Sequence, residues 1–134
     1  MKKFFIFDAN SIIHRFFHAL PPLMSRDNKP AGAIYGLSVF LLNIFSAEGG
    51  SVSGGREEKP DYIAAAFDRP DPTFRDAIFK DYKAHRPPTA NELIYQLTEA
   101  HNLLNAFHIK TLEIPGWEAD DIIGTLAEKF GNLK

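Results

Sequence analysis

The stretch IPGWEADDIIGTL, residues 114–126, combines a cluster of acids with the start of a helix, and the rest of the chain is best considered in relation to it. A Pro-Gly pair ends an extended run, and apolar residues then recur at i, i+3, i+4, i+7 and i+11 from Ala119, which predicts an amphipathic helix. Three carboxylates, Glu118, Asp120 and Asp121, fall in its first turn. Exposed N–H groups and the helix dipole favour negative charge there, so helix stabilisation alone explains them. A metal site is the alternative, and it depends on the rest of the chain.

The composition is that of an ordinary soluble globular protein. The chain has 134 residues, of which 45% are hydrophobic and 24% charged, with a formal net charge of -2. We therefore expect a single domain over residues 1–134, without a global basic field. The absence of cysteine excludes disulfides and thiolate zinc sites. No apolar run approaches the roughly 18 residues of a membrane span, so we expect a cytoplasmic protein without a membrane partner.

Upstream of the acidic helix, two short apolar runs each end on a carboxylate. Residues 4–7 run into Asp8, and residues 61–67 run into Asp68. Uniform apolarity over a short span predicts strands that are buried on both faces, as in a parallel sheet. A third short strand is expected at residues 110–114. Helical patterns lie between these runs, so we predict an α/β fold of three layers, with a mostly parallel sheet and helices on both faces.

Further local expectations concern caps and loops. Asn10 or Ser11 can cap the first helix. Residues 33–45 predict a well-buried helix, with Tyr35, Val39 and Leu42 widening its core stripe. Residues 47–58, AEGGSVSGGREE, predict a flexible Gly/Ser loop inserted within the domain.

Because parallel strands end at one edge of a sheet, the acids that follow them are expected to gather there. Carboxylates that converge without matching cations repel each other, and divalent cations resolve that repulsion. Oxygen ligands alone suit Mg²⁺ or Mn²⁺ better than Zn²⁺, and Mg²⁺ held by carboxylates usually serves phosphate chemistry. The pattern favours a metal-dependent phosphoryl or phosphodiester enzyme, although turn or cap chemistry explains Asp8 or Asp68 alone. The predicted metal ligands are Asp8, Asp68, Glu118, Asp120 and Asp121.

The run FRDAIFKDYKAHR, residues 74–86, is the second candidate constellation. If residues 74–85 form a helix, cations and aromatics share one face, where they can grip phosphates and stack on a base. A solvated face is the simpler alternative, because Asp76 and Asp81 interleave with the cations. Trp117, beside Glu118, is interpreted as a packing residue. The residues on the predicted face are Arg75, Phe79, Tyr82, Lys83 and Arg86.

Four segments together resemble a known family. FDANSIIHRFFHALPPL, AGAIYGL, AAAFDRPDPTFRDAIFKDYKAHRPP and IPGWEADDIIGTLA are similar to the 5′→3′ exonuclease domain of bacterial DNA polymerase I, a flap endonuclease within the wider PIN-like nucleases. The resemblance covers nearly the whole chain except the Gly/Ser insertion. It implies a PIN-like, resolvase-like fold and Mg²⁺-dependent cleavage of DNA phosphodiesters at a 5′ end or flap.

The resemblance also implies roles for individual residues. The five acids match metal-site positions, and Asp8, Asp68, Lys83 and Arg86 match positions engaged in catalysis. The stretch from Arg75 to Pro88 would begin a helical arch through which the 5′ end passes. The residues implied in DNA binding are Arg15, Arg75, Phe79, Tyr82, Lys83 and Arg86.

The family pattern continues beyond this sequence. Members carry a further strand with a Gly-Asp-x-Asp pair and then a helix–loop–helix element, whereas this sequence ends at Lys134. We therefore expect the N-terminal portion of such a nuclease, whose partners are DNA with a 5′ end or flap, and the C-terminal remainder of the nuclease or a polymerase domain. Two alternatives stay open: a catalytically incomplete DNA-binding or assembly module, and a PIN-like ribonuclease.

Overall fold

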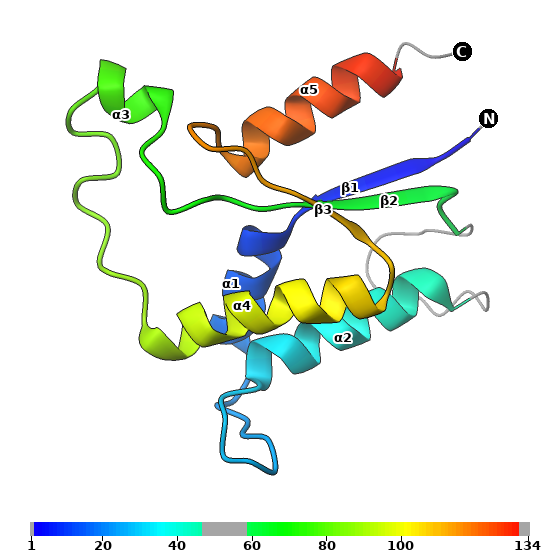
Figure 1. The fold of residues 1–134 in the computed structure, drawn as a ribbon. Helices are drawn as coiled ribbons and strands as arrows, with labels where there is room; N and C mark the ends of the chain where they lie inside the picture. Colours follow the sequence, from blue (N-terminus) through cyan, green and yellow to red (C-terminus); the bar gives the residue numbers. More distant parts are fainter. Residues whose placement is uncertain (1, 47–58, 132–134) are drawn as a thin grey trace.

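The computed structural model describes residues 2–46 and 59–131 (Figure 1). The predicted Gly/Ser loop at 47–58 lies outside the described residues. Strands and helices alternate along the chain, as the sequence predicts. The elements in order are β1 (Phe4–Asp8), α1 (Ala9–Ala19), α2 (Gly32–Phe45), β2 (Tyr62–Ala66), α3 (Phe74–Ile78), α4 (Asn91–Ala106), β3 (Lys110–Leu112) and α5 (Ala119–Gly131).

The described strands form one parallel sheet in the order β1-β2-β3. The register pairs Asp8 at the end of β1 with Ala66 at the end of β2, and pairs Ala66 in turn with Leu112 at the end of β3. The three carboxyl ends therefore meet at one edge of the sheet. The same edge faces α3 and the start of α5, on the left of Figure 1. This confirms the predicted parallel arrangement.

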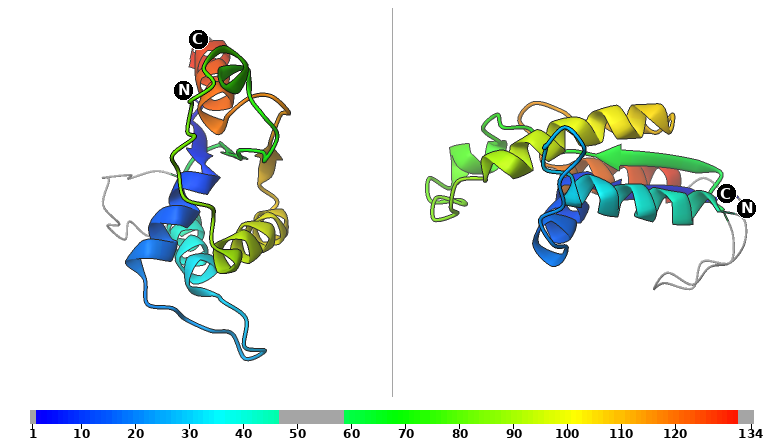
Figure 2. Two further views of the ribbon diagram at one scale, coloured as in Figure 1. Left: turned by 90° about the vertical axis from the view of Figure 1, so that its left-hand side faces the viewer. Right: turned by 90° about the horizontal axis from the view of Figure 1, so that it is seen from below.

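Helices cover both faces of the sheet, which confirms the three-layer α/β prediction. Side chains alternate between the faces along each strand. Phe7 and Ala65 belong to the larger core with α1, α2 and α4, whereas Ala66 packs with Ala119 and Ile122 of α5. The left panel of Figure 2 places α5 at the top, on the opposite side of the strands from these three helices.

The turn from β1 into α1 is fixed by side chains of both elements. Asp8, and not Asn10 or Ser11 as we predicted, is the N-cap of α1, and its carboxylate accepts hydrogen bonds from the Ser11 backbone N–H at 2.9 Å and hydroxyl at 2.7 Å. Asn10 is instead turned towards β2, where its Oδ1 accepts from the Asp68 backbone N–H at 3.0 Å. The first helix therefore forms as predicted, but its N-cap lies two residues before Asn10 and three before Ser11.

The α2 helix is buried on one side only. Leu37 and Leu41 are fully buried, but Tyr35, Val39 and Leu42 are 57%, 40% and 56% exposed, which corrects the predicted wider stripe. Among the described elements α2 packs mainly against α1 and α4, and that packing leaves these three side chains exposed. In the described part of the chain, no helix has both the length and the apolarity needed to span a membrane.

The predicted helix over residues 74–85 is wrong beyond its first turns. The α3 helix ends at Ile78, Phe79 is extended, and turns follow. Lys83 has a φ of 57°, which an α-helix does not accommodate. Hydrogen bonds from Tyr82 and Lys83 to Glu118 hold this segment in place, so tertiary contacts replace the helical ladder. The predicted single helix face does not form.

Candidate active site

The acidic edge is built where the strand ends meet α5. Asp68 follows β2, and its Oδ1 accepts a hydrogen bond from the Ala119 backbone N–H at 2.7 Å. This bond satisfies one of the N–H groups that the first turn of a helix leaves without an intrahelical partner. Asp68 thereby fixes the N-terminus of α5, and with it Glu118, Asp120 and Asp121, at the carboxyl edge of the sheet.

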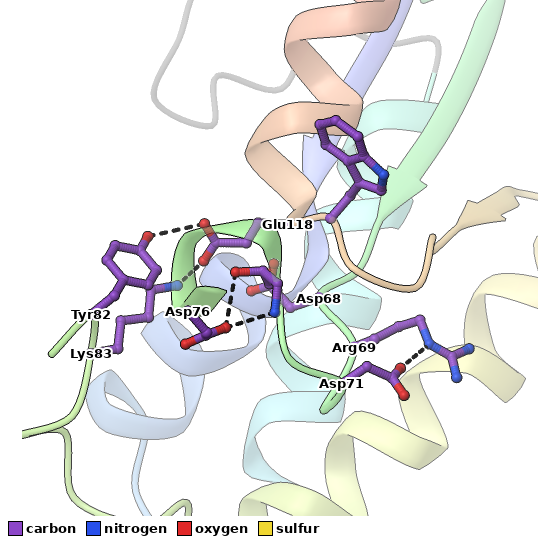
Figure 3. Close-up of a pocket in the computed structure, with 9 residues that line it drawn as sticks. Asp68, Arg69, Asp71, Asp76, Tyr82, Lys83 and Glu118 are labelled. Atoms are coloured by element: carbon purple, nitrogen blue, oxygen red, sulfur yellow. Dashed lines mark hydrogen bonds and ion pairs between the residues drawn. The ribbon is translucent and has the colours of Figure 1, made fainter. Parts of the chain in front are cut away.

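Glu118 is the most enclosed of these acids, at 8% exposure. Its carboxylate accepts a hydrogen bond from Arg75 at 2.6 Å. It also accepts from the Tyr82 hydroxyl at 3.0 Å and from the Lys83 ammonium (Figure 3). Burial alone would raise the pKa of Glu118, but the hydrogen bonds from Lys83 and Tyr82 leave it below its usual value. Glu118 is therefore held as a carboxylate whose charge is balanced by the chain itself.

Asp121 completes this ionic network from the first turn of α5. Both of its oxygens accept from the Arg75 guanidinium at 2.7 Å, and Oδ2 also accepts from the Glu118 backbone N–H at 3.0 Å. The hydrogen bonds with Arg75 lower the pKa of Asp121 and raise that of Arg75. A bidentate pair of this kind is among the stronger ionic contacts in proteins.

The network corrects one premise of the sequence prediction. We expected acids that converge without matching cations, but Arg75 and Lys83 supply those cations. Asp8 is occupied as a helix cap, and Asp120 is exposed. Among the described residues, no group of three or more His, Asp or Glu side chains is arranged to hold a metal ion. The acids gather at one edge, yet Glu118 and Asp121 face cations there, and Asp8 and Asp68 accept from backbone N–H groups.

A small pocket of about 160 Å³ opens beside the network (Figure 3). Its floor is stiffened by Thr73 and Asp76, which form a capping box at the start of α3. Arg69 and Asp71 form an ion pair on its far side. The lining therefore combines carboxylates, cations and aromatics: Asp68, Arg69, Asp71, Thr73, Asp76, Tyr82, Lys83, Trp117 and Glu118.

Three predicted DNA-binding residues lie outside the network. Arg15 is exposed on α1, and Phe79 is 64% exposed just after α3. Arg86 is also exposed, but its charge acts on His14, as do the charges of Asp8 and Asp68. In the described part of the chain Arg86 donates no side-chain hydrogen bond to an acid, so it stands outside the network of Glu118 and Asp121.

Two residues near the edge were missed or undervalued by sequence reasoning. His14 is half-buried on α1, and burial, followed by His18, lowers its pKa, whereas Asp8 and Asp68 oppose that shift. Nothing in the sequence pattern distinguishes it from an exposed histidine. Trp117 packs on another aromatic as expected, but half of its surface is exposed at the pocket. The sequence offered one signal that Trp117 lies at the site, which is that it directly precedes Glu118.

The donor set indicates the chemistry that this edge can support. Carboxylate oxygens without thiolates are ligands for a hard divalent cation, and adjacent Arg and Lys side chains suit a phosphate. The α/β fold brings both sets to the carboxyl edge of a parallel sheet, which is where open sheets of this kind bind their ligands.

The family comparison agrees. The sequence model for the 5′-3′ exonuclease, N-terminal resolvase-like domain matches residues 3–134, and the chain belongs to that family. It is 41% identical to the 5′-3′ exonuclease of Aquifex aeolicus over 130 residues, covering 97% of this chain and 42% of the relative. It is 40% identical to DNA polymerase I of Caldicellulosiruptor bescii over 130 residues, covering 97% and 14%. The chain thus spans less than half the length of these relatives.

A solved structure supports the fold. The structure of T5 5′-exonuclease with bound divalent metal ions (zinc) matches with a TM-score of 0.57 at 18% identity. The match covers 99% of this chain and 46% of the T5 5′-exonuclease chain. The resolvase-like α/β architecture predicted from the sequence is therefore shared with an exonuclease.

Proposed function

We propose that this chain is the metal- and DNA-binding portion of a Mg²⁺-dependent nuclease that cleaves DNA phosphodiesters at a 5′ end or flap. The observation that carries the proposal is the contact between Glu118 and the basic segment Arg75, Tyr82 and Lys83. It joins candidate metal ligands to candidate phosphate ligands in one network.

The residues that would hold the ion are the acids of the strand ends and of the first turn of α5. Their donor chemistry fits Mg²⁺ or Mn²⁺, whereas their present arrangement pairs two of them with cations. When bound, a divalent ion activates water and offsets charge on the attacking and leaving oxygens. The proposed ligands are Asp8, Asp68, Glu118, Asp120 and Asp121.

The basic segment has two tasks in this proposal. In the absence of substrate, Arg75 and Lys83 neutralise Glu118 and Asp121. In the presence of DNA, the same side chains and Arg86 offer their charge to the phosphate, which orients it and offsets the charge that develops during cleavage. Tyr82 gives up its hydrogen bond to Glu118 and presents its ring to a base.

The partners follow from the same proposal. The relatives include DNA polymerase I and a separate 5′-3′ exonuclease, so the longer protein would supply the C-terminal part of the nuclease, with or without a polymerase domain. A DNA substrate and a sequence without cysteine also fit a cytoplasmic location.

A second candidate is a module that binds DNA without cleaving it. It is favoured by one observation: among the described residues no metal-ready group of acids is present, because Arg75 and Lys83 occupy Glu118 and Asp121. In this alternative the ion pairs are permanent and only the exposed aromatics and cations meet DNA.

A cleavage assay on a 5′-labelled flap duplex separates the two candidates when the chain is tested together with the C-terminal part that the longer protein would supply. We expect release of the flap in Mg²⁺ and none in EDTA, and we expect Asp68→Asn and Asp120→Asn to abolish release in chains that circular dichroism shows to be folded. Binding of the flap without release in Mg²⁺ would instead favour the module. Release that persists in both variants would refute the assigned metal ligands.

A further inference from the structure

Trp117, the only tryptophan of the chain, is placed where a ligand of the pocket would meet it. It lies between β3 and α5, lines the pocket, and directly precedes Glu118. Half of its surface, 50%, is exposed to solvent. A large aromatic ring that is half exposed at the wall of a charged pocket has room to accept a flat ligand.

The ring is held by two short loops that are tied together. The centroids of the Trp117 and Phe74 rings are 5.1 Å apart, at an interplanar angle of 52°. The Phe74 backbone N–H donates to the Gly116 carbonyl at 3.2 Å, and the Trp117 N–H donates to the Ile114 carbonyl at 3.2 Å. Gly116 has a φ of +83°, which glycine adopts without strain, so the turn that presents Trp117 is preorganised.

Two cations lie against aromatic rings of this region, one of them against Phe74. The Arg75 guanidinium carbon lies 4.5 Å from the Phe74 ring centroid, and the Lys83 ammonium lies 5.1 Å from the Tyr82 ring centroid. Trp117 and Lys83 line the same pocket. A ligand with a flat ring on Trp117 and a negative group next to that ring would meet both features at once.

Single-stranded nucleic acid carries both of these groups, a flat base and a negatively charged phosphate next to it. Proteins that bind it combine aromatic side chains, on which bases stack, with cations that follow the phosphates. An apolar protein partner would use the exposed rings but leave the neighbouring cations without a role. The lining also carries the carboxylates of Asp68, Asp71, Asp76 and Glu118. The choice of nucleic acid therefore rests on Arg75 and Lys83, which would exchange their carboxylate partners for a phosphate.

We propose that Trp117, supported by Phe74, is a stacking platform for one base of single-stranded DNA and directs the adjoining phosphate towards Arg75 and Lys83. The proposal deepens the proposed function and rests on it for the class of ligand. Trp117 is a positioning residue here, since it touches a base and not the reacting atoms.

The test uses the fluorescence of this single tryptophan in the 134-residue chain, in EDTA so that cleavage is absent. The probe is a short oligothymidylate, compared with an abasic oligonucleotide of equal length and charge. We expect saturable quenching by oligothymidylate and little by the abasic strand. Equal quenching by both strands, or none by either, would overturn the platform.

Affinity is measured separately, from the anisotropy of a labelled oligothymidylate. Trp117→Ala should weaken binding roughly 5- to 150-fold, the range found for loss of one stacked base, and Trp117→Phe should recover most of it. Tyr35→Ala removes an exposed aromatic from α2 as the matched control and should change nothing. Equal affinity of Trp117→Ala and the unaltered chain would overturn the proposal.

The flap-cleavage assay distinguishes failure of the stacking platform from failure of the nuclease proposal. Base-dependent quenching of the 134-residue chain, without cleavage in Mg²⁺ when the C-terminal part is present, retains the platform and refutes the nuclease. Cleavage with no effect of Trp117→Ala on affinity refutes the platform alone.

Discussion

The guanidinium of Arg75 binds both carboxylate oxygens of Asp121, 46 residues further along the chain, with two N–O distances of 2.7 Å. This contact joins α3 to the first turn of α5, and Glu118 shares the same guanidinium. The chain thus carries its own counterions for the acids that we assign to a metal. A divalent ion that binds these acids has to displace Arg75 and Lys83 from them.

Replacement of Lys83 should therefore move metal affinity and cleavage in opposite directions. In Lys83→Met the Glu118 carboxylate loses a competing cation, so the metal affinity of the DNA-free chain should rise. Lys83 is about a third exposed, so we take the range for screened pairs, about 0.5–1 kcal/mol, or two- to fivefold in affinity. Cleavage should fall about 100-fold, because a donor to the phosphate is lost.

Mn²⁺ binding followed by electron paramagnetic resonance gives the affinity, and the flap duplex gives the cleavage rate. Lys80→Met, three residues earlier in the same segment, removes the same charge as a control and should change neither quantity by more than about twofold. A fall in Mn²⁺ affinity in Lys83→Met would show that the ammonium supports the metal site and does not compete with it.

The Arg75–Asp121 contact should also make stability depend on pH. Because the pKa of Asp121 is lowered in the folded chain, the contact stabilises the fold fully above about pH 5, where unfolded Asp is ionised. The stabilisation is lost as the pH falls through the native pKa. Asp121→Asn should cost roughly 1–2 kcal/mol of unfolding free energy at pH 7, and less towards pH 3.

Urea unfolding in EDTA at pH 3, 5 and 7 measures this difference. Asp120→Asn, an exposed neighbour in the same helical turn, makes the same charge change and should cost less at pH 7. If Asp121→Asn lowered the unfolding free energy by the same amount at every pH, the ion pair would not be the source of that loss.

Much of this architecture was predictable because local patterns determine it. Apolar runs that end on Asp8 and Asp68 marked two strands and their shared edge, and the spacing after Ala119 marked α5. The third strand ended at Leu112, two residues earlier than predicted, because pairing with β2 stops there. Short edge strands carry little sequence signal of their own.

The parts that were not predictable depend on contacts between distant segments. The turns after α3 form because Tyr82 and Lys83 reach Glu118, 36 and 35 residues later, and no local spacing encodes that contact. The pairing of cations with acids could not be inferred for the same reason. The local sequence of residues 74–85 favours a helix, but these tertiary hydrogen bonds stabilise turns in its place.

Gln96 provides a third prediction, since it caps α2 from another helix. Its side chain is 2% exposed, and its Oε1 accepts from the backbone N–H groups of Ala33 at 2.7 Å and Ile34 at 3.2 Å. Ala31, at the N-cap position of α2, has no side-chain acceptor. Gln96→Leu keeps the volume but leaves a buried N–H without a partner, so we expect a loss of about 1–3 kcal/mol.

Denaturant unfolding with circular dichroism measures this loss. Thr98→Val, on the exposed side of the same helix, also removes a side-chain hydrogen bond and should stay within about 0.5 kcal/mol of the unaltered chain. If Gln96→Leu were as stable as Thr98→Val, another group would have to satisfy the start of α2.

Two glycines in helices predict effects of opposite sign when changed to alanine. At Gly36 on α2, an added Cβ would lie 2.4 Å from Cγ and 2.8 Å from Cβ of Phe16, so α1 and α2 would have to separate. Overpacking of this kind costs about 1–3 kcal/mol. At Gly124 on α5, an added Cβ would meet no heavy atom within 4 Å among the described residues. Gly124→Ala should therefore gain about 0.5–1 kcal/mol from helix propensity.

Paired urea titrations of Gly36→Ala and Gly124→Ala make this comparison independent of any functional assignment. The chemical change is the same in both chains, so helix propensity favours alanine equally, and the contact with Phe16 is the remaining difference. In the Phe16→Ala background, Gly36→Ala should lower the unfolding free energy by less than it does in the unaltered chain, because the ring that the new methyl group meets is absent. Additive losses in this double-mutant cycle would show that the close approach of α1 and α2 at Gly36 does not limit the packing of these helices.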